Sequence, residues 1–189
     1  MWILASASPR RKELLAEIIP EFEIIPSCAD EDVTEYGSPA ELVKILAERK
    51  AAEVASRKEN EGKFVIGSDT VVAYGNEVLG KPKDEADAFR MLKMLSGKRH
   101  EVYTGVCIYI CKGKKVERRV EADVTSVYFN ELSDDWIWQY IRGGSPMDKA
   151  GAYGIQDGGL VAKIEGSYSN VVGLPVELCK RMIKEIINE

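Results

Sequence analysis

The chain has 189 residues, of which 45% are hydrophobic and 30% are charged, as is typical of a soluble globular protein. Its net charge of −5 argues against general binding to nucleic acids or anionic membranes, so basic residues that meet a substrate should be grouped locally. The sequence has no apolar run as long as a membrane span and no signal-peptide pattern in its first residues. We therefore expect a cytoplasmic protein.

Turn residues and hydrophobic patterning divide the chain into strands and helices. Strands are predicted over residues 2–5, 22–25, 64–67, 70–74, 77–79, 100–111, 115–128 and 160–164. Helices are predicted over residues 9–19, 39–58, 84–95, 133–142 and 174–187. A Gly-rich stretch covers 143–159, and Lys112-Gly113-Lys114 is typical of a hairpin turn. Early alternation of strands and helices, followed by an antiparallel middle, predicts a mixed α/β sheet.

The first predicted helix begins with an unusual charge pattern. Ser8 suits the N-cap and Pro9 the first helical position, but Arg10 and Arg11 then lie at the positive end of the helix dipole. Another helix start, Ser38-Pro39-Ala40-Glu41, has the usual acidic first turn of a capping box. Free amides, hydroxyls and two arginines at a strand-to-helix turn favour an anion site, most simply for phosphate. The alternative is a pair of solvated arginines.

Asp69 stands inside the otherwise apolar segment 64–72. A strand this hydrophobic is expected to be buried on both faces, where an unpaired carboxylate is costly. Asp69 therefore needs a cation, a metal or a position at the rim, and an aspartate suits a general base or metal ligand at a phosphate site. The alternative is an Asp turn between two strands.

Three further charged residues are candidates. Lys50 follows Leu46 by four on a predicted helix, so its stem lies beside the apolar face and its ammonium either reaches solvent or meets an anion. Lys81 follows a predicted strand and precedes Pro82, which suits either a phosphoryl contact or solvent. Glu31 lies in an acidic loop that is either solvated or binds a divalent metal.

The remaining polar features are ambiguous on their own. Gln156 ends a stretch of small residues, and its amide complements the imide edge of uracil or thymine; it could equally bond its own loop. The loop 165–175 either lines a pocket or caps the last helix. The only histidine, His100, is interpreted as structural, and the four cysteines as reduced, buried thiols.

Together these motifs resemble the Maf family of nucleotide pyrophosphatases. The matching segments follow one another over nearly the whole chain. They are Ser6-Ala7-Ser8-Pro9-Arg10-Arg11, Glu31, Lys50-Ala51, Ser68-Asp69-Thr70, Gly80-Lys81-Pro82, Ser96-Gly97, His100-Glu101-Val102-Tyr103-Thr104-Gly105, 148–156 and the loop 165–175.

The resemblance implies an elongated mixed β-sheet with flanking helices, forming two lobes around a cleft, as in the related inosine-triphosphate pyrophosphatases. It also implies hydrolysis of a nucleoside triphosphate to monophosphate and pyrophosphate with a divalent cation, Mg²⁺ or Mn²⁺. One branch of the family is similar to dTTP/UTP pyrophosphatases and another to 7-methyl-GTP pyrophosphatases. Arg11, Thr70 and Gln156 match the dTTP/UTP form.

On this resemblance residues 1–189 form a single domain. Asp69 is the expected general base, with Lys50 and Lys81 as catalytic partners, and Glu31 and Asp69 are the expected metal ligands. The expected substrate-binding residues are Ser6, Ser8, Arg10, Arg11, Thr70 and Gln156. Such proteins are treated as cytoplasmic house-cleaning enzymes with a link to septum formation. We expect a homodimer that binds neither nucleic acid nor membrane.

Two other classes of function stay open at this point. The chain could be a nucleotide-binding regulator of cell division whose hydrolysis is incidental, although a pure binder has little need for a carboxylate such as Asp69 beside phosphates. Nucleotidyl transfer is a further alternative, which the absence of an evident second-substrate motif disfavours.

Overall fold

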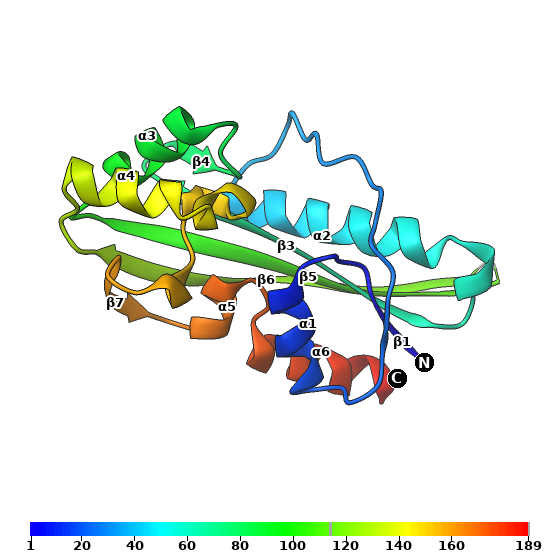
Figure 1. Cartoon of the computed structure of the whole chain (residues 1–189). Helices are drawn as coiled ribbons and strands as arrows, with labels where there is room; N and C mark the ends of the chain where they lie inside the picture. The colour runs from blue at the N-terminus through cyan, green and yellow to red at the C-terminus, as the bar shows by residue number, and fades with distance from the viewer. Residues whose placement is uncertain (114, 189) are drawn as a thin grey trace. The chain divides into compact units, whose positions relative to one another are not determined.

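The computed structural model describes residues 1–113 and 115–188 (Figure 1). The strands are β1 (Trp2–Leu4), β2 (Glu23–Ile24), β3 (Phe64–Tyr74), β4 (Glu77–Leu79), β5 (Arg99–Lys112), β6 (Lys115–Phe129) and β7 (Val161–Glu165). The α-helices are α1 (Pro9–Ala16), α2 (Pro39–Ala55), α3 (Glu85–Leu95), α4 (Asp134–Arg142), α5 (Tyr168–Val172) and α6 (Val176–Ile187). The 3₁₀ turns are η1 (Lys58–Asn60), η2 (Ser145–Asp148), η3 (Ala150–Ala152) and η4 (Ile155–Asp157).

The strands form one mixed sheet. They hydrogen-bond in the order β2-β1-β3-β5-β6-β7, and β4 pairs with β3. β1 runs parallel to both β2 and β3, with Ile3 opposite Glu23 and Val65. β4 is antiparallel to β3, and β7 is antiparallel to β6. The predicted mixed α/β sheet is therefore confirmed.

The chain divides into two compact units, each with its own core. Unit 1 comprises Met1–Asp69, Thr104–Asp123 and Gly173–Glu189. Unit 2 comprises Thr70–Tyr103 and Val124–Val172. By these bounds β3, β5 and β6 contribute residues to both units. Within the described residues, no helix is long and apolar enough to cross a membrane.

In unit 1 the period of two along each strand sends alternate residues into two different cores. Helix α2 covers one face of the strands, while α1 and α6 lie on the other (Figure 1). The core beneath α2 contains Ile3, Ala5, Ala47, Ala51, Val54, Ala55, Val65 and Cys107. The core beneath α1 and α6 contains Leu4, Leu15, Ile19, Ile66, Val106, Ile108, Leu174, Cys179, Met182 and Ile186. β3 is accordingly buried on both faces, as predicted.

Unit 2 packs α3 and α4 over its own strands. Its core includes Val72, Leu79, Ala88, Met91, Leu92, Leu95, Val102, Val127, Phe129, Ile137, Ile141 and Leu160. His100 is buried in the same unit, and its Nε2 lies 2.8 Å from the Tyr153 hydroxyl. Its ring also packs edge-on against Phe129. The structural interpretation of His100 is thus confirmed.

The element boundaries differ from the prediction where tertiary contacts or prolines intervene. Helix α1 ends at Ala16 instead of residue 19, before Pro20, and α2 ends at Ala55 instead of residue 58. Helix α5 within the loop 165–175 was not predicted. The Gly-rich stretch folds into 3₁₀ turns. Lys114, the last residue of the predicted hairpin turn, lies outside the described residues.

Two predictions are wrong in a more informative way. Residues 64–74 form one continuous strand, so Ser68, Asp69 and Thr70 do not make a turn between two strands. Ser68 and Asp69 find polar partners without leaving the strand, since the Ser68 hydroxyl donates to the Gly173 carbonyl and the Asp69 carboxylate contacts Lys50. The expectation of buried cysteines also fails at Cys28, which is exposed, and at Cys111, which is half-buried; Cys107 and Cys179 are buried, and all four thiols are free.

Candidate functional site

The centre of the candidate site in unit 1 is where α2 packs directly on β3. A Cβ built at Gly67 would lie 2.3 Å from the Ala47 carbonyl oxygen, and one at Gly105 would lie 2.2 Å from the Val43 carbonyl oxygen. Only glycine permits backbones to approach this closely. Asp69 follows Gly67 by two residues, so its side chain emerges on the same face, toward α2.

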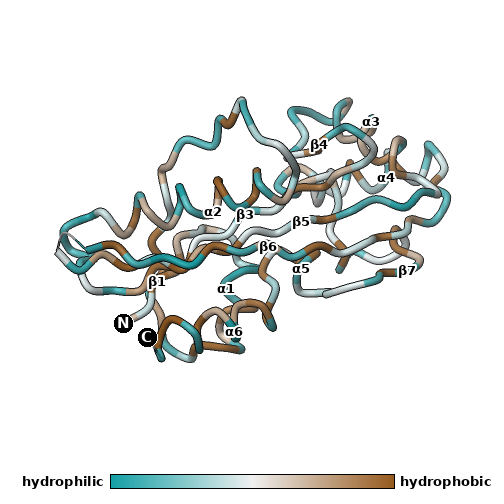
Figure 2. Tube along the Cα trace, turned by 180° about the vertical axis from the view of Figure 1, so that it is seen from behind, coloured by the Kyte–Doolittle hydropathy of each residue, from teal (hydrophilic) through white to brown (hydrophobic). Residues whose placement is uncertain are grey.

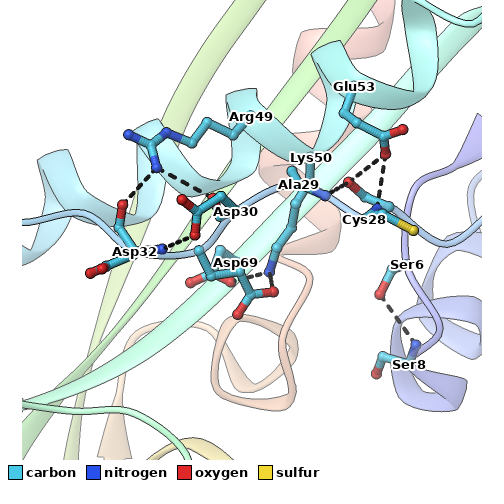
Figure 3. A network of polar contacts seen from close by, with 12 residues as sticks. Ser6, Ser8, Cys28, Ala29, Asp30, Asp32, Arg49, Lys50, Glu53 and Asp69 are labelled. Carbon is cyan, nitrogen blue, oxygen red and sulfur yellow. Dashed lines mark hydrogen bonds and ion pairs between the residues drawn. The ribbon is translucent and has the colours of Figure 1, made fainter.

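The Asp69 carboxylate meets the ammonium group of Lys50 from α2 (Figure 3). The Lys50 Nζ lies 2.5 Å from Asp69 Oδ1 and 2.8 Å from Glu31 Oε1. The side chains of Lys50 and Asp69 are each 12% exposed, whereas that of Glu31 is 60% exposed. One largely buried cation therefore joins two carboxylates that are 38 residues apart in the sequence. Of the two alternatives for Lys50, contact with an anion is the one observed.

Ser68 points to the opposite face of β3 and contributes to a second polar group. Its hydroxyl donates to the carbonyl oxygen of Gly173 at 3.1 Å, and the Nε of Arg11 donates to the same oxygen at 2.8 Å. The segment before α6 is thereby tied to β3 and to α1. This contact also explains how a serine can occupy the middle of a fully buried strand.

The start of α1 carries the hydroxyls and arginines predicted for it. Ser8 is the N-cap and accepts from the Arg11 amide at 3.4 Å, and the Ser8 amide donates to the Ser6 hydroxyl at 3.2 Å. A guanidinium nitrogen of Arg11 also donates to the Ser6 hydroxyl at 3.4 Å. The first turn contains no acidic residue, which confirms the reversed charge pattern.

The charge of Arg11 also interacts with the two carboxylates that contact Lys50. Burial lowers the pKa of its guanidinium, the Asp69 carboxylate raises it, the neighbouring Arg10 lowers it and Glu31 raises it. Arginine keeps its charge through such shifts because its ordinary pKa is so high. The charge of Arg11 is therefore coupled to those of Arg10, Glu31 and Asp69. These four residues belong to unit 1, as do Ser6, Ser8 and Lys50.

The other predicted site residues belong to unit 2. Thr70 directly follows Asp69 on β3, and Lys81 is exposed after β4. Gln156 is exposed in η4. The carbonyl oxygen of Gly80 accepts from the Gly151 amide at 3.0 Å, which joins the segment of Lys81 to the Gly-rich segment that leads to Gln156.

The Gln156 turn is further fixed by Tyr140 of α4. The Tyr140 hydroxyl accepts from the Gly154 amide at 3.1 Å and donates to the Asp157 carboxylate. Its ring stacks on Trp136 at 5.3 Å between ring centroids. The turn is therefore anchored on both sides of Gln156.

The donor set suits a hard divalent cation in part. Among the described residues there is no group of three or more His, Cys, Asp or Glu side chains placed to hold a metal. Glu31 and Asp69 nevertheless converge on one cation, Lys50, and carboxylate oxygens are what Mg²⁺ prefers when phosphate oxygens and water complete its coordination. The residues present therefore fit a metal shared with a phosphate ligand.

Sequence reasoning missed the residues that position this group. Gly67 sets the approach of α2, but its ordinary backbone conformation leaves no local signal. Glu53 and Arg49 of α2 hold the segment that carries Glu31, through acceptors and donors on the backbone. In the sequence, an i, i+4 pair such as Arg49 and Glu53 is typical of an ordinary solvated helix face.

The family comparison matches almost the whole chain. Residues 1–186 match the family model described as "Maf-like protein". A "dTTP/UTP pyrophosphatase" of Thermococcus kodakarensis is 54% identical over 180 residues, which is 94% of this chain and 93% of that protein. One of Carboxydothermus hydrogenoformans is 52% identical over 184 residues, 96% of each chain. One of Clostridium tetani is 47% identical over 188 residues, 98% of this chain and 97% of that protein.

A solved structure shares the fold. The Ham1 protein of Staphylococcus aureus aligns with a TM-score of 0.54 and 17% sequence identity, over 98% of each chain. At this identity the likeness concerns the fold alone. It agrees with the mixed α/β architecture expected from the sequence.

Proposed function

Because the chain belongs to the Maf family, we propose that it is a nucleoside triphosphate pyrophosphatase that hydrolyses dTTP and UTP to the monophosphate and pyrophosphate. The observation that carries this proposal is the 47–54% identity, over nearly the full length, to proteins named dTTP/UTP pyrophosphatases. The Lys50, Glu31 and Asp69 group supports it, since a carboxylate beside phosphates can act as a general base in hydrolysis, whereas a pure binder has little need for one.

The triphosphate is proposed to lie at the start of α1. The Ser6 and Ser8 hydroxyls and the first-turn amides are donors, and Arg10 and Arg11 supply positive charge at the same helix end. Helix N-termini bind phosphate through such amides and through the helix dipole. In the proposed complex, the arginines neutralise the charge that develops on the departing pyrophosphate.

Asp69 is proposed as the general base. Its carboxylate accepts a proton from a water molecule as the water oxygen bonds to the α-phosphorus, and the bond from that phosphorus to the bridging oxygen breaks to release pyrophosphate. Lys50 holds Asp69 in place and compensates its charge, as the 2.5 Å contact supports. Lys81 is proposed as a further phosphate contact. Most of the rate enhancement comes from positioning and charge neutralisation.

Glu31 and Asp69 would hold the divalent cation, Mg²⁺ or Mn²⁺, together with phosphate oxygens. When bound, such an ion neutralises phosphate charge and orients the triphosphate. Lys50 contacts both carboxylates, so it can fix the distance between the Glu31 and Asp69 carboxylates when they meet a ligand.

Base recognition is proposed for Gln156, with Thr70 and Arg11 as the other residues that match the dTTP/UTP branch. The Gln156 amide can accept from N3–H and donate to a neighbouring carbonyl of uracil or thymine. The Tyr140 contacts support a fixed turn at this position. From the same resemblance we propose a cytoplasmic homodimer with a house-cleaning role.

The experiment is a substrate panel. The purified chain with Mg²⁺ is given dTTP, UTP, ATP, dATP and 7-methyl-GTP, and pyrophosphate release is measured for each. The proposal expects the highest kcat/KM for dTTP and UTP and loss of turnover with EDTA. Preference for 7-methyl-GTP would place the chain in the other branch. Tight binding without pyrophosphate release would favour a regulator.

A further inference from the structure

The segment that carries Glu31 lacks regular structure of its own. Between β2 and α2, the described residues 25–36 contain no helix or strand. Figure 2 shows hydrophilic and hydrophobic stretches along the loop that leads to α2, but each of residues 25–36 is exposed or half-buried, so little apolar burial holds the segment in place. Glu31 itself is exposed. Its carboxylate can meet Lys50 reproducibly only if other contacts fix the backbone on either side.

The upstream end of this segment is attached to Glu53 of α2. The Cys28 amide donates to Glu53 Oε2 at 2.9 Å (Figure 3). The Ser27 hydroxyl donates to the same oxygen at 2.9 Å. Arg57 donates to both carboxylate oxygens of Glu53 at 2.8 and 2.9 Å. Burial raises the pKa of Glu53, but the Cys28 amide, Arg57 and Ser27 outweigh it and hold the pKa below its ordinary value. Glu53 is therefore an ionised anchor.

The second attachment holds the residues on either side of Glu31. The Arg49 Nη1 donates to the carbonyl oxygen of Asp30 at 3.3 Å and to that of Asp32 at 2.8 Å (Figure 3). The Asp32 amide also donates to the Asp30 carboxylate at 2.9 Å, which closes a tight turn around Glu31. One guanidinium nitrogen thus fixes the carbonyl groups of the two residues that flank the glutamate.

The helical register of α2 explains why this arrangement delivers Glu31 to the site. Arg49 and Glu53 are four residues apart and share one helix face, which holds the segment. Lys50 is the next residue after Arg49 and projects toward β3, where it meets Asp69 and Glu31. Adjacent residues of one helix therefore fix the backbone of Glu31 and contact its carboxylate.

We propose that Arg49 is a positioning residue that acts through Glu31, by holding the Asp30 and Asp32 carbonyls so that the Glu31 carboxylate stays at Lys50 and Asp69. This inference rests on the proposed function, because Glu31 matters for turnover only if the site hydrolyses nucleotides. Arg49 itself does not contact the reacting atoms in this account.

The test compares two substitutions at Arg49 with a matched control. Arg49→Met keeps the stem but removes the donors, and Arg49→Lys keeps a cation that can donate. The control is Arg118→Met. Arg118 is an exposed arginine of β6 that pairs with Glu48 of α2, the helix that carries Arg49, at 2.9 Å. Each variant is assayed for dTTP hydrolysis and for amide hydrogen exchange in peptides that cover residues 27–33.

We expect Arg49→Met to lower kcat/KM by about tenfold, less than the roughly hundredfold cost of an ångström's misplacement. Exchange at residues 27–33 should become faster, while the thermal midpoint stays close to that of the wild type. Arg49→Lys should recover part of both effects, and Arg118→Met should match the wild type. Wild-type exchange rates in Arg49→Met would overturn the proposal, whatever the activity.

A double-variant measurement separates this proposal from the proposed function. If Arg49 acts through Glu31, adding Arg49→Met to Glu31→Gln should cause no further loss of turnover. Independent, additive losses would contradict the proposal while leaving the pyrophosphatase assignment intact. If the wild type fails to hydrolyse dTTP, the proposed function fails, and the exchange experiment still decides whether Arg49 holds the segment.

Discussion

The ammonium nitrogen of Lys50 lies 2.5 Å from the carboxylate of Asp69, and this contact connects α2 to β3. Both side chains are largely buried, so each charge depends on the other for the solvation that water would provide. The pair also defines the direction in which Asp69 faces. The proposed hydrolysis depends on this carboxylate more than on any other group.

Asp69→Asn is expected to reduce turnover by about 10²–10⁴-fold, because the amide is nearly isosteric but cannot accept the proton of water. Nucleotide binding should largely remain, since the direct phosphate contacts are assigned to other residues and the amide oxygen of Asn can still act as a cation ligand. Steady-state kinetics and calorimetric titration with a non-hydrolysable dTTP analogue measure the two effects. The same substitution at Asp135, which is exposed on α4, is the control. Near wild-type turnover in Asp69→Asn would exclude Asp69 as the base.

Gly67→Ala is expected to destabilise the protein and impair turnover together. The added Cβ would lie 2.3 Å from the Ala47 carbonyl oxygen, and backbone cannot move aside as a flexible side chain can. Overpacking of this kind costs about 1–3 kcal/mol. Urea denaturation measures the loss, with Gly80→Ala as control because a Cβ there meets nothing within 4 Å. Equal stability of the two variants would refute the close approach of α2.

His100 should make the stability of the protein depend on pH below neutrality. Burial lowers its pKa from the ordinary 6.5 to about 3, so the unfolded chain takes up a proton between these values and the folded chain does not. Its contribution is fully present above pH 6.5 and is lost as the pH falls toward 3, by up to about 1.4 kcal/mol per pH unit. As the pH is lowered from 7.5 to 4.5, the urea midpoint should fall less steeply in His100→Gln than in the wild type. Parallel curves would contradict the assignment.

Gln156→Ala should narrow the preference for UTP and dTTP over ATP and dATP. A site built on hydrogen bonds to one base edge penalises another edge by leaving its own groups unpaired. The loss should therefore appear as a lower kcat/KM for the pyrimidines. Specificity constants for the four nucleotides, compared between wild type and variant, measure it. An unchanged ratio would assign base reading to other groups.

Sequence patterns predicted features whose causes are local. Ser8 and Pro9 mark the start of α1 because capping depends on neighbouring amides. Lys50 was placed beside the apolar face of its helix by a spacing of four. Features that depend on distant partners were missed or wrong. Ser68 stays within a strand because its hydroxyl reaches the carbonyl of Gly173, and no sequence period reports such a contact.

The positioning residues were missed for a related reason. Arg49 binds backbone carbonyls, which every residue carries, so its partners leave no mark on the sequence. Gly67 has an ordinary backbone conformation, and its importance lies in the distance to α2. A single sequence can therefore suggest which groups do chemistry sooner than it can show what holds them in place.

Hydrolysis of dTTP in ¹⁸O-labelled water, followed by phosphorus NMR of the products, tests the central claim most directly. If water attacks the α-phosphorus with Asp69 as base, the label appears in the phosphate of dTMP, and the co-product is unlabelled pyrophosphate. The wild type should give this pattern with both dTTP and UTP. Label in orthophosphate with a nucleoside diphosphate as co-product, or label in pyrophosphate, would contradict the account.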